Sequence, residues 1–391
     1  MKKSIVYITL GLLVFSQGLK AQIDIQGQLN EISPMVSDYM DFYFYDLSNY
    51  QGDIYQNSIN YSGDVLGQWE MKIALNAGIA FKPVYSANVL RHSNNFELNG
   101  DDPNLYAFGP NMFSNLDEAE LFFRFTDPIT NGAVYDPFTG EKVGFSIPVF
   151  EGMGTGMTFS PAVMPVISLG VGFGTELSVG IMPGAIQSLG VSIPGDFTIA
   201  SDLSYIGALK HDIFHWIRPL AERDYHLTLG VNYASFDMGI APQSENGLFK
   251  SDQSQRDYYY FDDNFEGIDF HTGALGFELM ATKEFKWVDL SLFASMNQAE
   301  YSIKSVGDIV FHINTSFKAG SADEFKTYTV SDYVNVNKSF SSLLYGAAVK
   351  FHFGGFNLGA KYAYKGGTGQ GSHFVSTTLG FAFDLKKKKA E

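Results

Sequence analysis

Apolar residues alternate with polar or small residues along many segments of this chain. From Tyr225 to Tyr233 every second side chain is apolar, and the residues between them are polar or small. Successive side chains of a β-strand point to opposite faces of the sheet, so a period of two predicts strands with one apolar face. The chain is therefore expected to be all-β. The same alternation recurs at residues 69–81, 345–353, 356–364 and 375–383.

A soluble β-sandwich shows this alternation too, but two features favour a transmembrane antiparallel β-barrel. Residues 69–81 alternate without interruption, which makes a longer strand than a sandwich requires. The connections also alternate in length, with short turns at 283–286 and 354–355 and long segments at 237–268 and 303–338. If the last strand ends in the periplasm, the short turns are periplasmic and the long segments extracellular, as in bacterial outer-membrane barrels.

The predicted barrel covers residues 67–385 and has about fourteen strands, within a range of about 12 to 16, because bacterial barrels have even strand numbers. A weak hairpin at 143–149 and 153–159 is counted among the fourteen. The glycines at alternate positions of 170–174 predict curvature or close approach of another chain segment rather than a phosphate loop. The other strands are expected near residues 69–81, 84–91, 118–126, 164–174, 175–183, 197–209, 224–236, 269–282, 287–302, 339–353, 356–365 and 372–385.

The N-terminus predicts export. Lys2 and Lys3 precede an apolar run from Ile5 to Phe15, and the small residue Ala21 precedes Gln22. A run of about 11 apolar residues is too short to span a bilayer and is typical of a signal peptide. We therefore interpret residues 1–21 as a cleaved signal peptide, with the cell outer membrane as the destination.

Composition excludes several other classes of protein. The chain has no Cys, which excludes a disulfide-stapled domain and Cys-ligated zinc or iron–sulfur centres. The formal charge is −16, and residues 1–21 carry three Lys and no acid, so the exported chain has a charge of −19. A body this acidic repels nucleic acid. The expected partners are outer-membrane lipid, lipopolysaccharide, the barrel-insertion machinery and, under one hypothesis, a small apolar ligand.

Three segments fall outside the strand pattern. Residues 22–66 mix Asp and Tyr and contain a short helix after Ser37; this segment is expected either to enter the lumen as a plug or to lie in the periplasm. Residues 209–220 place five apolar residues on one helical face and predict a short periplasmic amphipathic helix, which rests on the lipid surface or closes the barrel floor. Residues 386–391 form a basic C-terminal tail.

Polar residues on the inward face of the predicted strands are the candidate functional residues. A lining of mixed charge fits either a water-filled channel or a lumen sealed by its own salt bridges. The predicted lumen-lining residues are Glu176, Asp202, His226, Asn232, Glu278, Asp289, Lys350, His352 and Lys361.

A second candidate is an acidic and aromatic extracellular loop. Dense carboxylates could hold Ca²⁺ or cations that bridge lipopolysaccharide, but an EF-hand register from Asp262 places Gly273 where the bidentate Glu belongs. The residues of this loop are Asp257, Tyr258, Tyr259, Asp262, Asp263 and Glu266.

Patterns of metal and catalytic sites are weak. His211 and His215 stand four residues apart, a spacing that could place two imidazoles on one metal, but no third ligand accompanies them. The chain has no G-x-S-x-G elbow and no Walker A sequence. We therefore predict no metal site, no cofactor, no catalytic residue and no enzyme activity.

Short strings of residues resemble a family of uncharacterised outer-membrane barrels of Bacteroidota, a domain of unknown function. They are Gln68-Trp69-Glu70, residues 165–170 leading to 174–177, and residues 206–213. More distantly, the chain is similar to the long-chain fatty-acid transporter family, which implies fourteen strands and an N-terminal hatch formed by residues 22–66. That family's N-terminal motif is not matched, and Phe383 is followed by a Lys-rich tail instead of ending the chain.

The leading functional hypothesis is a barrel that passes or binds a small hydrophobic molecule through a partly plugged lumen. The alternative is a non-transporting structural barrel, or a subunit of a surface or secretion assembly whose acidic extracellular segments contact a partner. An outer-membrane hydrolase is the third class considered.

Overall fold

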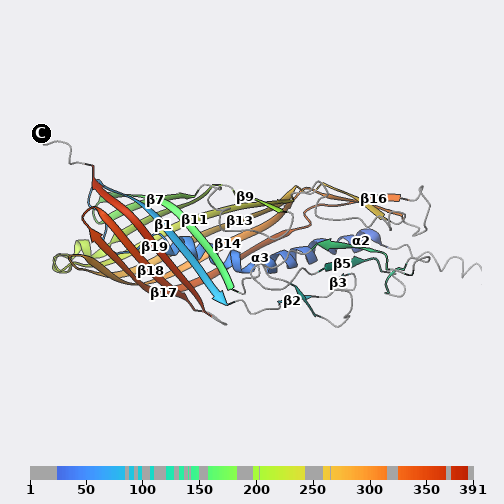
Figure 1. Ribbon diagram of the computed structural model, residues 1–391, viewed down its shortest axis with the longest axis horizontal. Helices are drawn as coiled ribbons and strands as arrows, with labels where there is room; N and C mark the ends of the chain where they lie inside the picture. The colour runs from blue at the N-terminus through green and yellow to red at the C-terminus, as the bar shows by residue number, and fades with distance from the viewer. Residues whose placement is uncertain are drawn as a thin grey trace, which may run out of the picture.

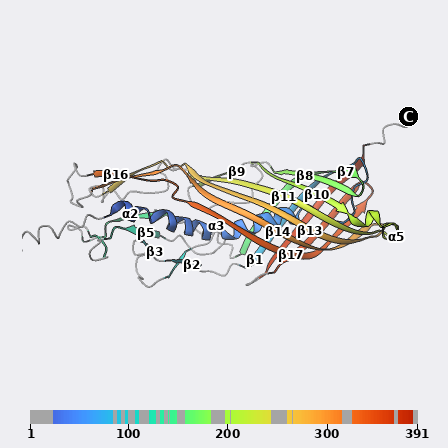
Figure 2. The same cartoon turned by 180° about the vertical axis from the view of Figure 1, so that it is seen from behind.

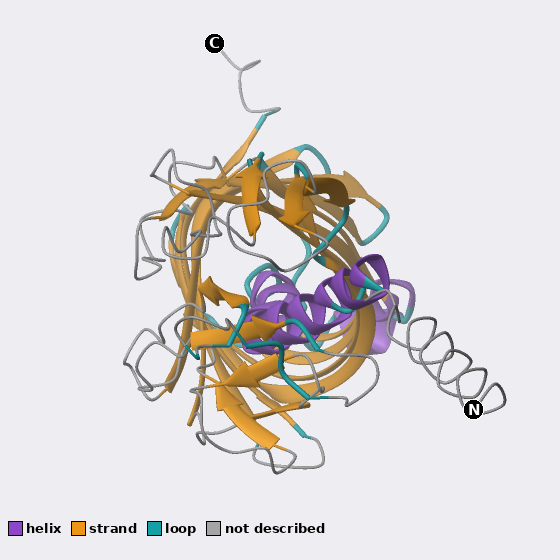
Figure 3. Ribbon diagram, turned by 90° about the vertical axis from the view of Figure 1, so that its right-hand side faces the viewer, coloured by secondary structure: helices purple, strands orange, loops and turns teal. Residues whose placement is uncertain are grey.

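A closed antiparallel β-barrel forms the body of the protein, and a long helix runs along its interior (Figures 1, 2 and 3). This computed structural model describes residues 24–83, 88–91, 96–98, 106–109, 120–126, 132–135, 140, 142–148, 157–182, 197–201, 203–242, 259–264, 266–314, 325–366 and 371–385. The signal peptide and the basic tail predicted from the sequence lie outside these residues.

Ten strands close the barrel within the described residues, and every neighbouring pair is antiparallel. The seam joins the first strand to the last, from Glu70 opposite Asp384 to Phe81 opposite His373. The prediction of an all-β antiparallel barrel is confirmed. In order around the wall the strands are β1 (Glu70–Pro83), β7 (Met157–Gly172), β8 (Thr175–Met182), β10 (Ser204–Asp212), β11 (Tyr225–Pro242), β13 (Gly267–Glu284), β14 (Val288–Val306), β17 (Asn335–Phe353), β18 (Phe356–Lys365) and β19 (Ser372–Asp384).

The predicted number of about fourteen barrel strands is wrong, because four predicted strands do not add to the wall. Those near 84–91 and 118–126 fall on small separate sheets, and the first arm of the hairpin at 143–149 joins the second of these. The hairpin's second arm supplies only the start of β7. Alternation indicates that a segment forms a strand, but not which sheet the strand joins. The period alone therefore could not distinguish these strands from those of the barrel wall. The small sheets contain β2 (Asn88–Arg91) with β4 (Tyr106–Gly109), and β5 (Glu120–Arg124) between β3 (Phe96–Leu98) and β6 (Gly144–Pro148).

Four neighbouring strands lengthen one side of the wall. β11 and β13 have 18 residues each and β14 and β17 have 19 each, whereas β8 has 8 and β18 has 10. We call the end that these strands extend the far end, and the opposite end, with the turns at 173–174, 285–287 and 354–355, the turn end. At the far end β9 (Phe197–Ser201) pairs with β11, and β12 (Tyr259–Asp263), β15 (Ile309–Asn314) and β16 (Phe325–Val330) form a further sheet. The two segments predicted as long loops, 237–268 and 303–338, therefore hold strand ends and all three strands of this sheet.

An apolar belt surrounds the wall near the turn end. Its outward side chains are exposed, among them Ile73, Leu75, Ile167, Val179, Leu229, Phe277, Leu292, Leu358 and Leu379. Exposed aromatic residues flank the belt, with Trp69, Phe285, Trp287, Phe353 and Phe381 toward the turn end and Tyr205, Tyr233, Tyr345 and Tyr362 on the other side. Beyond the second aromatic row, the outward residues of the long strands include His271, Gln298, Glu300 and Asn337. An apolar band between two aromatic girdles is the pattern of a membrane-spanning barrel.

The interior helix is α3 (Ile32–Asn57), preceded by the short α2 (Ile25–Leu29). α3 contacts β1, β7, β11, β13, β14, β17 and β19, and the view along the barrel shows it inside the ring of strands (Figure 3). Its N-terminus lies at the far end, and residues 58–69 continue from its C-terminus to the turn end, where β1 begins (Figure 1). In the described residues, no helix is both long and apolar enough to cross a membrane.

Residues 209–220 do not form the predicted amphipathic helix. Leu209 to Asp212 complete β10, and only the 3₁₀ helix η1 (Ile213–Trp216) and the single-turn helix α5 (Arg218–Ala221) follow at the turn end (Figure 2). The side chain of Asp212 accepts a hydrogen bond from the N–H of Phe214 and caps η1. The spacing resembled a helical face because Leu209, on the outer face of β10, precedes the apolar residues of the following turn at intervals that also fit a helix.

Candidate functional site

The interior contact between the N-terminal segment and the wall is the candidate functional site. Residues 50–63 are all buried, so the wall encloses this part of the chain on every side. Inward glycines make room for it. A Cβ atom at Gly78 would lie 2.3 Å from Ser58 Oγ, and one at Gly276 would lie 2.6 Å from Gln56 Oε1. At these glycines the segment therefore packs so closely against the wall that no side chain fits between them.

Asp53 fixes α3 to three wall strands and is only 1% exposed. Its Oδ1 accepts hydrogen bonds from Asn297 Nδ2 and Ser342 Oγ, both at 2.6 Å, and its Oδ2 accepts one from Lys365 Nζ at 2.8 Å. A buried carboxylate that accepts three hydrogen bonds, one of them from an ammonium group, sets both the depth and the rotation of the helix.

The chain below α3 is held by polar contacts as it descends to the turn end. Asn76 Nδ2 donates to the carbonyl of Ser58 at 2.6 Å, and Ser62 Oγ donates to Asp289 Oδ2 at 2.7 Å. A Cβ atom at Gly170 would lie 2.0 Å from the carbonyl oxygen of Gly67, so only glycine lets the chain pass here. This confirms the close approach predicted for the alternating glycines.

Opposite charges inside the barrel are paired. Glu176 lies 3.1 Å from Lys210 Nζ and 3.6 Å from Lys72 Nζ, and Glu278 Oε2 lies 2.5 Å from Lys361 Nζ. Charges that neutralise one another within the wall correspond to the sealed lumen, one of the two interpretations that the sequence left open.

The structure places eight of the nine predicted lumen-lining residues inside the barrel. Glu176, Asn232, Glu278, Asp289, Lys350 and Lys361 are buried there. His226 and His352 are partly buried near the turn end, and Asp202 lies outside the described residues. Their roles in function stay predictions.

The predicted acidic loop is in part a strand. Tyr259, Asp262 and Asp263 belong to β12, where Tyr259 is fully buried and Asp262 Oδ2 lies 3.1 Å from His312 Nε2. Glu266 is exposed beside the start of β13, while Asp257 and Tyr258 lie outside the described residues. Tyr259 belongs to the buried face of this sheet, a role that the acid-rich composition did not indicate.

His211 and His215 do not form a metal-binding pair. His211 lies on β10, where its Nδ1 lies 2.9 Å from Thr175 Oγ1 and its Nε2 accepts a hydrogen bond from Trp216 Nε1 at 3.2 Å. Both ring nitrogens are therefore engaged, and His215 lies on η1 instead of one helical turn away.

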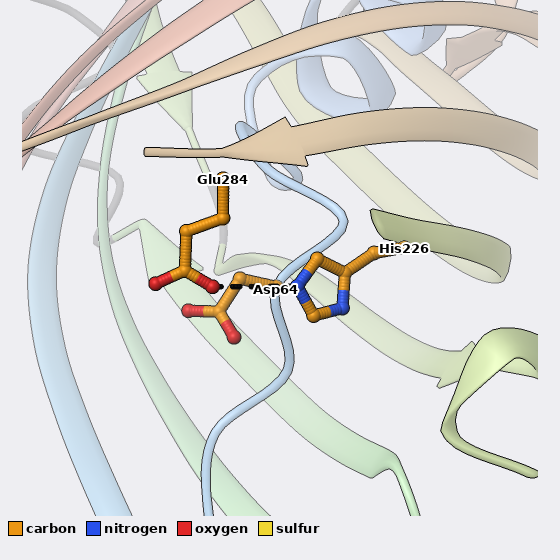
Figure 4. A group of neighbouring side chains, drawn as sticks. All are labelled: Asp64, His226 and Glu284. Carbon is orange, nitrogen blue, oxygen red and sulfur yellow. Dashed lines mark hydrogen bonds and ion pairs between the residues drawn. The ribbon is translucent and has the colours of Figure 1, made fainter. Parts of the chain in front are cut away.

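Instead, a different group gathers at the turn end. Asp64, on the segment below α3, lies beside His226 of β11 and Glu284 of β13 (Figure 4). The potential ligand atoms of the three side chains all lie within 4.8 Å of one another. Asp64 and His226 border a cavity of about 320 Å³ that is also lined by Gln68, Phe173 and Asp212.

Sequence reasoning missed Asp53, Asp64 and Glu284, and assigned Lys210 and Asp212 to a helix. A signal for Asp53 was present, because Gln51, Asp53, Gln56 and Asn57 place polar groups on several faces of one helix. A helix that is polar on all sides and yet ordered needs a polar enclosure. Asp64 and Glu284 gave no such signal, because their proximity arises only from closure of the barrel.

The fold and the interior contacts define a ten-stranded β-barrel that holds its own N-terminal helix in its lumen. The chain belongs to DUF6588, a family of unknown function whose model matches residues 1–385. The resemblance to a family of unknown function is thereby confirmed, whereas an origin in Bacteroidota and a relation to the fatty-acid transporters stay predictions. No curated protein matches the chain significantly.

Several solved structures of outer-membrane barrels are similar to the chain. The translocator domain of the autotransporter NalP from Neisseria meningitidis has 10% identity and a TM-score of 0.34, over 88% of this chain and 99% of that one. The β domain of the Bordetella autotransporter BrkA has 10% identity and a TM-score of 0.27, over 81% and 100%. The toluene transporter TodX from Pseudomonas putida has 7% identity and a TM-score of 0.23, over 85% and 98%. Similarity at these levels carries no information on function.

Proposed function

We propose that the protein is an outer-membrane barrel that is closed by its own N-terminal segment and anchors an extension at the cell surface. In this proposal residues 1–21 direct export, residues 22–66 are the plug, residues 67–385 form the barrel and residues 386–391 form a basic tail. The apolar belt between two aromatic rows supports insertion into a bilayer. Lipid, lipopolysaccharide and the barrel-insertion machinery are its expected partners, and the far end is extracellular.

The observation that carries this proposal is the complete burial of residues 50–63 inside the wall. At this level the interior presents Asp53, Glu278 and Lys361, each paired with an opposite charge. Glu278 and Lys361 pair within the wall, but Asp53 belongs to the segment and accepts hydrogen bonds from Asn297, Ser342 and Lys365. An apolar molecule that displaced the segment would remove these three hydrogen bonds, at a cost of about 1–3 kcal/mol for each, and more for charged groups. The geometry therefore favours an anchor over a path for a hydrophobic molecule.

The far end supports a role at the surface. The outward residues of β11, β13, β14 and β17 beyond the belt include His271, Gln298, Glu300 and Asn337. These strands contact α3, whose first half lies above the predicted membrane together with the sheet of β12, β15 and β16 (Figure 1). Four lengthened strands that extend on one side form a wall on which a partner could rest.

Regulated passage of a small molecule is the second candidate. The observation in its favour is that the contacts below α3 are mostly hydrogen bonds and ion pairs. Water can replace polar contacts of this kind at little net cost when a segment moves, whereas it cannot replace apolar packing. We assign no catalytic residue in either case.

A reversible crosslink distinguishes the two candidates. A Cβ atom at Gly52 would lie 3.6 Å from Ala299 Cβ, which suits a disulfide, and the chain has no Cys of its own. Ala274 Cβ would lie only 2.7 Å away, so the variant combines Gly52→Cys and Ala299→Cys with Ala274→Gly. The control is Gly52→Cys with Ala274→Gly alone.

Conductance in planar bilayers and uptake of a small hydrocarbon into proteoliposomes are measured with the crosslink oxidised and then reduced. An anchor is silent in both states. Passage that appears only on reduction would overturn the anchor and support regulated transport. Comparing residues 22–391 with 67–391 then tests the plug, because a plugged lumen conducts only after truncation.

A further inference from the structure

We propose that Asp64, His226 and Glu284 bind a divalent transition-metal ion, with Zn²⁺ preferred, at the turn end of the barrel. His226 Nε2 lies 3.3 Å from Glu284 Oε2, and the Asp64 carboxylate completes the group (Figure 4). Donor atoms around a tetrahedral Zn²⁺ are about 3.4 Å apart, given bonds of about 2.1 Å. Since all three donor atoms lie within 4.8 Å, small side-chain rotations suffice to enclose an ion.

Asp212 prepares His226 as a ligand. Its Oδ1 accepts hydrogen bonds from the backbone N–H groups of Phe214 at 3.0 Å and Leu227 at 3.2 Å, which fixes the carboxylate. Its Oδ2 lies 2.8 Å from His226 Nδ1. A carboxylate that receives the Nδ1 proton of an imidazole leaves Nε2 with a lone pair, as in the carboxylate–histidine–zinc arrangement.

In this tautomer two acceptors face each other, because the Nε2 lone pair lies 3.3 Å from a Glu284 carboxylate oxygen. Two acceptors at this distance repel unless a proton or a metal ion lies between them. A metal ion between the two acceptors removes the repulsion and also binds the Asp64 carboxylate. A proton on His226 would remove the repulsion without involving Asp64.

The surrounding charge favours a cation. The three proposed groups are joined by the carboxylate of Asp212. Two Lys side chains lie beside Asp64: Lys350 Nζ is 3.5 Å from Asp64 Oδ2, and Lys210 Nζ donates to the Asp64 carbonyl oxygen at 2.7 Å. Lys350 is shared with Asp289 and Lys210 with Glu176, so the two Lys offset only part of this negative charge. A divalent ion would leave the group closer to neutral.

Access and donor chemistry narrow the identity of the ion. The side chain of Glu284 is 40% exposed and that of Asp64 31%, and the adjacent cavity has room for coordinated water. One imidazole with two carboxylates suits Zn²⁺ or a neighbouring transition metal better than Ca²⁺, which prefers oxygen ligands alone. The site is built from the plug segment and two wall strands, so a bound ion would also tie the segment to the wall.

The test is isothermal titration of ZnCl₂ into the EDTA-treated, refolded mature protein, with the visible spectrum of bound Co²⁺ as a reporter of coordination. One saturable site with intense Co²⁺ bands is expected. His226→Gln should weaken binding at least 100-fold, and Asp212→Asn about 10-fold, as for other residues that orient a ligand.

Controls separate this site from adventitious binding. His271 Nδ1 lies 2.5 Å from Asp237 Oδ1 in an exposed pair toward the far end, so His271→Gln should leave the affinity unchanged. Glu284→Gln, on a half-exposed side chain, tests the site if His226→Gln does not fold, as judged by heat-modifiable mobility. The proposal is overturned if the wild type shows no saturable site, if both ligand variants bind like the wild type, or if His271→Gln loses as much affinity.

Discussion

From Ile32 to Leu47 α3 buries one apolar face against the long strands, whereas from Tyr50 to Asn57 every residue is buried and several of the contacts are polar. In the first half Phe44 is fully buried, and its ring centroid lies 5.9 Å from that of Phe270. In the second half Asp53 joins three wall strands. One helix thus meets two different environments along its length.

The difference assigns a separate physical role to each half. Apolar packing is strong but weakly directional, and in the first half it is supplemented by the contacts of Asp41 with Tyr301 and Lys338. Buried hydrogen bonds to charged groups are directional and costly to misplace, so the second half sets the depth and rotation of the whole helix.

Removing the carboxylate of Asp53 should lower the free energy of unfolding more than any of the changes described below. Asp53→Ala leaves Lys365 without its buried partner and should lower the free energy of unfolding by about 4 kcal/mol. Urea unfolding of the refolded protein in lipid vesicles measures the loss. Asp38→Ala, on an exposed position of the same helix, should cost less than about 0.5 kcal/mol. Equal effects of the two changes would refute the special role of the second half.

A cavity in the first half should cost somewhat less. Phe44→Ala removes a fully buried ring and should lower the free energy of unfolding by about 3 kcal/mol, while the barrel should stay non-conducting because Asp53 still holds the second half. Unfolding and conductance are measured on the same preparation. Tyr45, which is 47% exposed, supplies the matched control Tyr45→Ala. Channel opening by Phe44→Ala would show that the two halves do not act separately.

A larger side chain on the wall beside the second half of α3 tests the close packing of the helix against the wall. Gly78→Ala would place a Cβ atom 2.3 Å from Ser58 Oγ and 3.1 Å from Ile54 Cγ2, so it should destabilise the barrel by about 2 kcal/mol. Gly207 on β10 has no atom within 4 Å of the corresponding position. Urea unfolding of Gly207→Ala should therefore match the wild type, and a comparable loss in both variants would contradict the argument.

The smallest effect is expected at the start of the N-terminal segment. The side chain of Asp24 accepts a hydrogen bond from the N–H of Gly27 at 2.9 Å and caps α2. Asp24→Ala should destabilise this end by about 1 kcal/mol. Hydrogen exchange should accelerate in residues 25–29 and stay unchanged in residues 50–57, and faster exchange in both would show that the segment moves as one unit.

Alternation predicted the wall well because a barrel strand repeats its environment every second residue. Leu229 on the belt and Tyr233 in the aromatic row are exposed, whereas Thr228 and Asn232, which precede them in sequence, are buried inside. The same rule overcounted strands, since the segment predicted at 84–91 alternates in the same way but its described residues, 88–91, pair with β4. Which partner a strand selects is set by the closure of the whole sheet, and a local period holds no information about it.

The sequence predicted which types of residue line the candidate site, but not which of these residues pair with one another. Inward parity placed Glu278 and Lys361 in the lumen, yet they lie 83 positions apart in sequence and meet only across the closed barrel. Asp53 was missed because its helix was expected to be short and to begin after Ser37, whereas α3 begins at Ile32. Enclosure by the wall stabilises a Tyr-rich and Asp-rich segment whose own helix propensity is modest.

The seam between β1 and β19 has a consequence for the order of assembly. The helix precedes the first wall strand, its N-terminus points to the far end, and the last strand closes the ring around it. Pulling an aromatic helix through a finished ring would expose its buried faces and break the wall's ion pairs. Strands that wrap around a helix already in place avoid that barrier. The pairing of β19 with β1 is then the step that encloses α3 in the closed barrel.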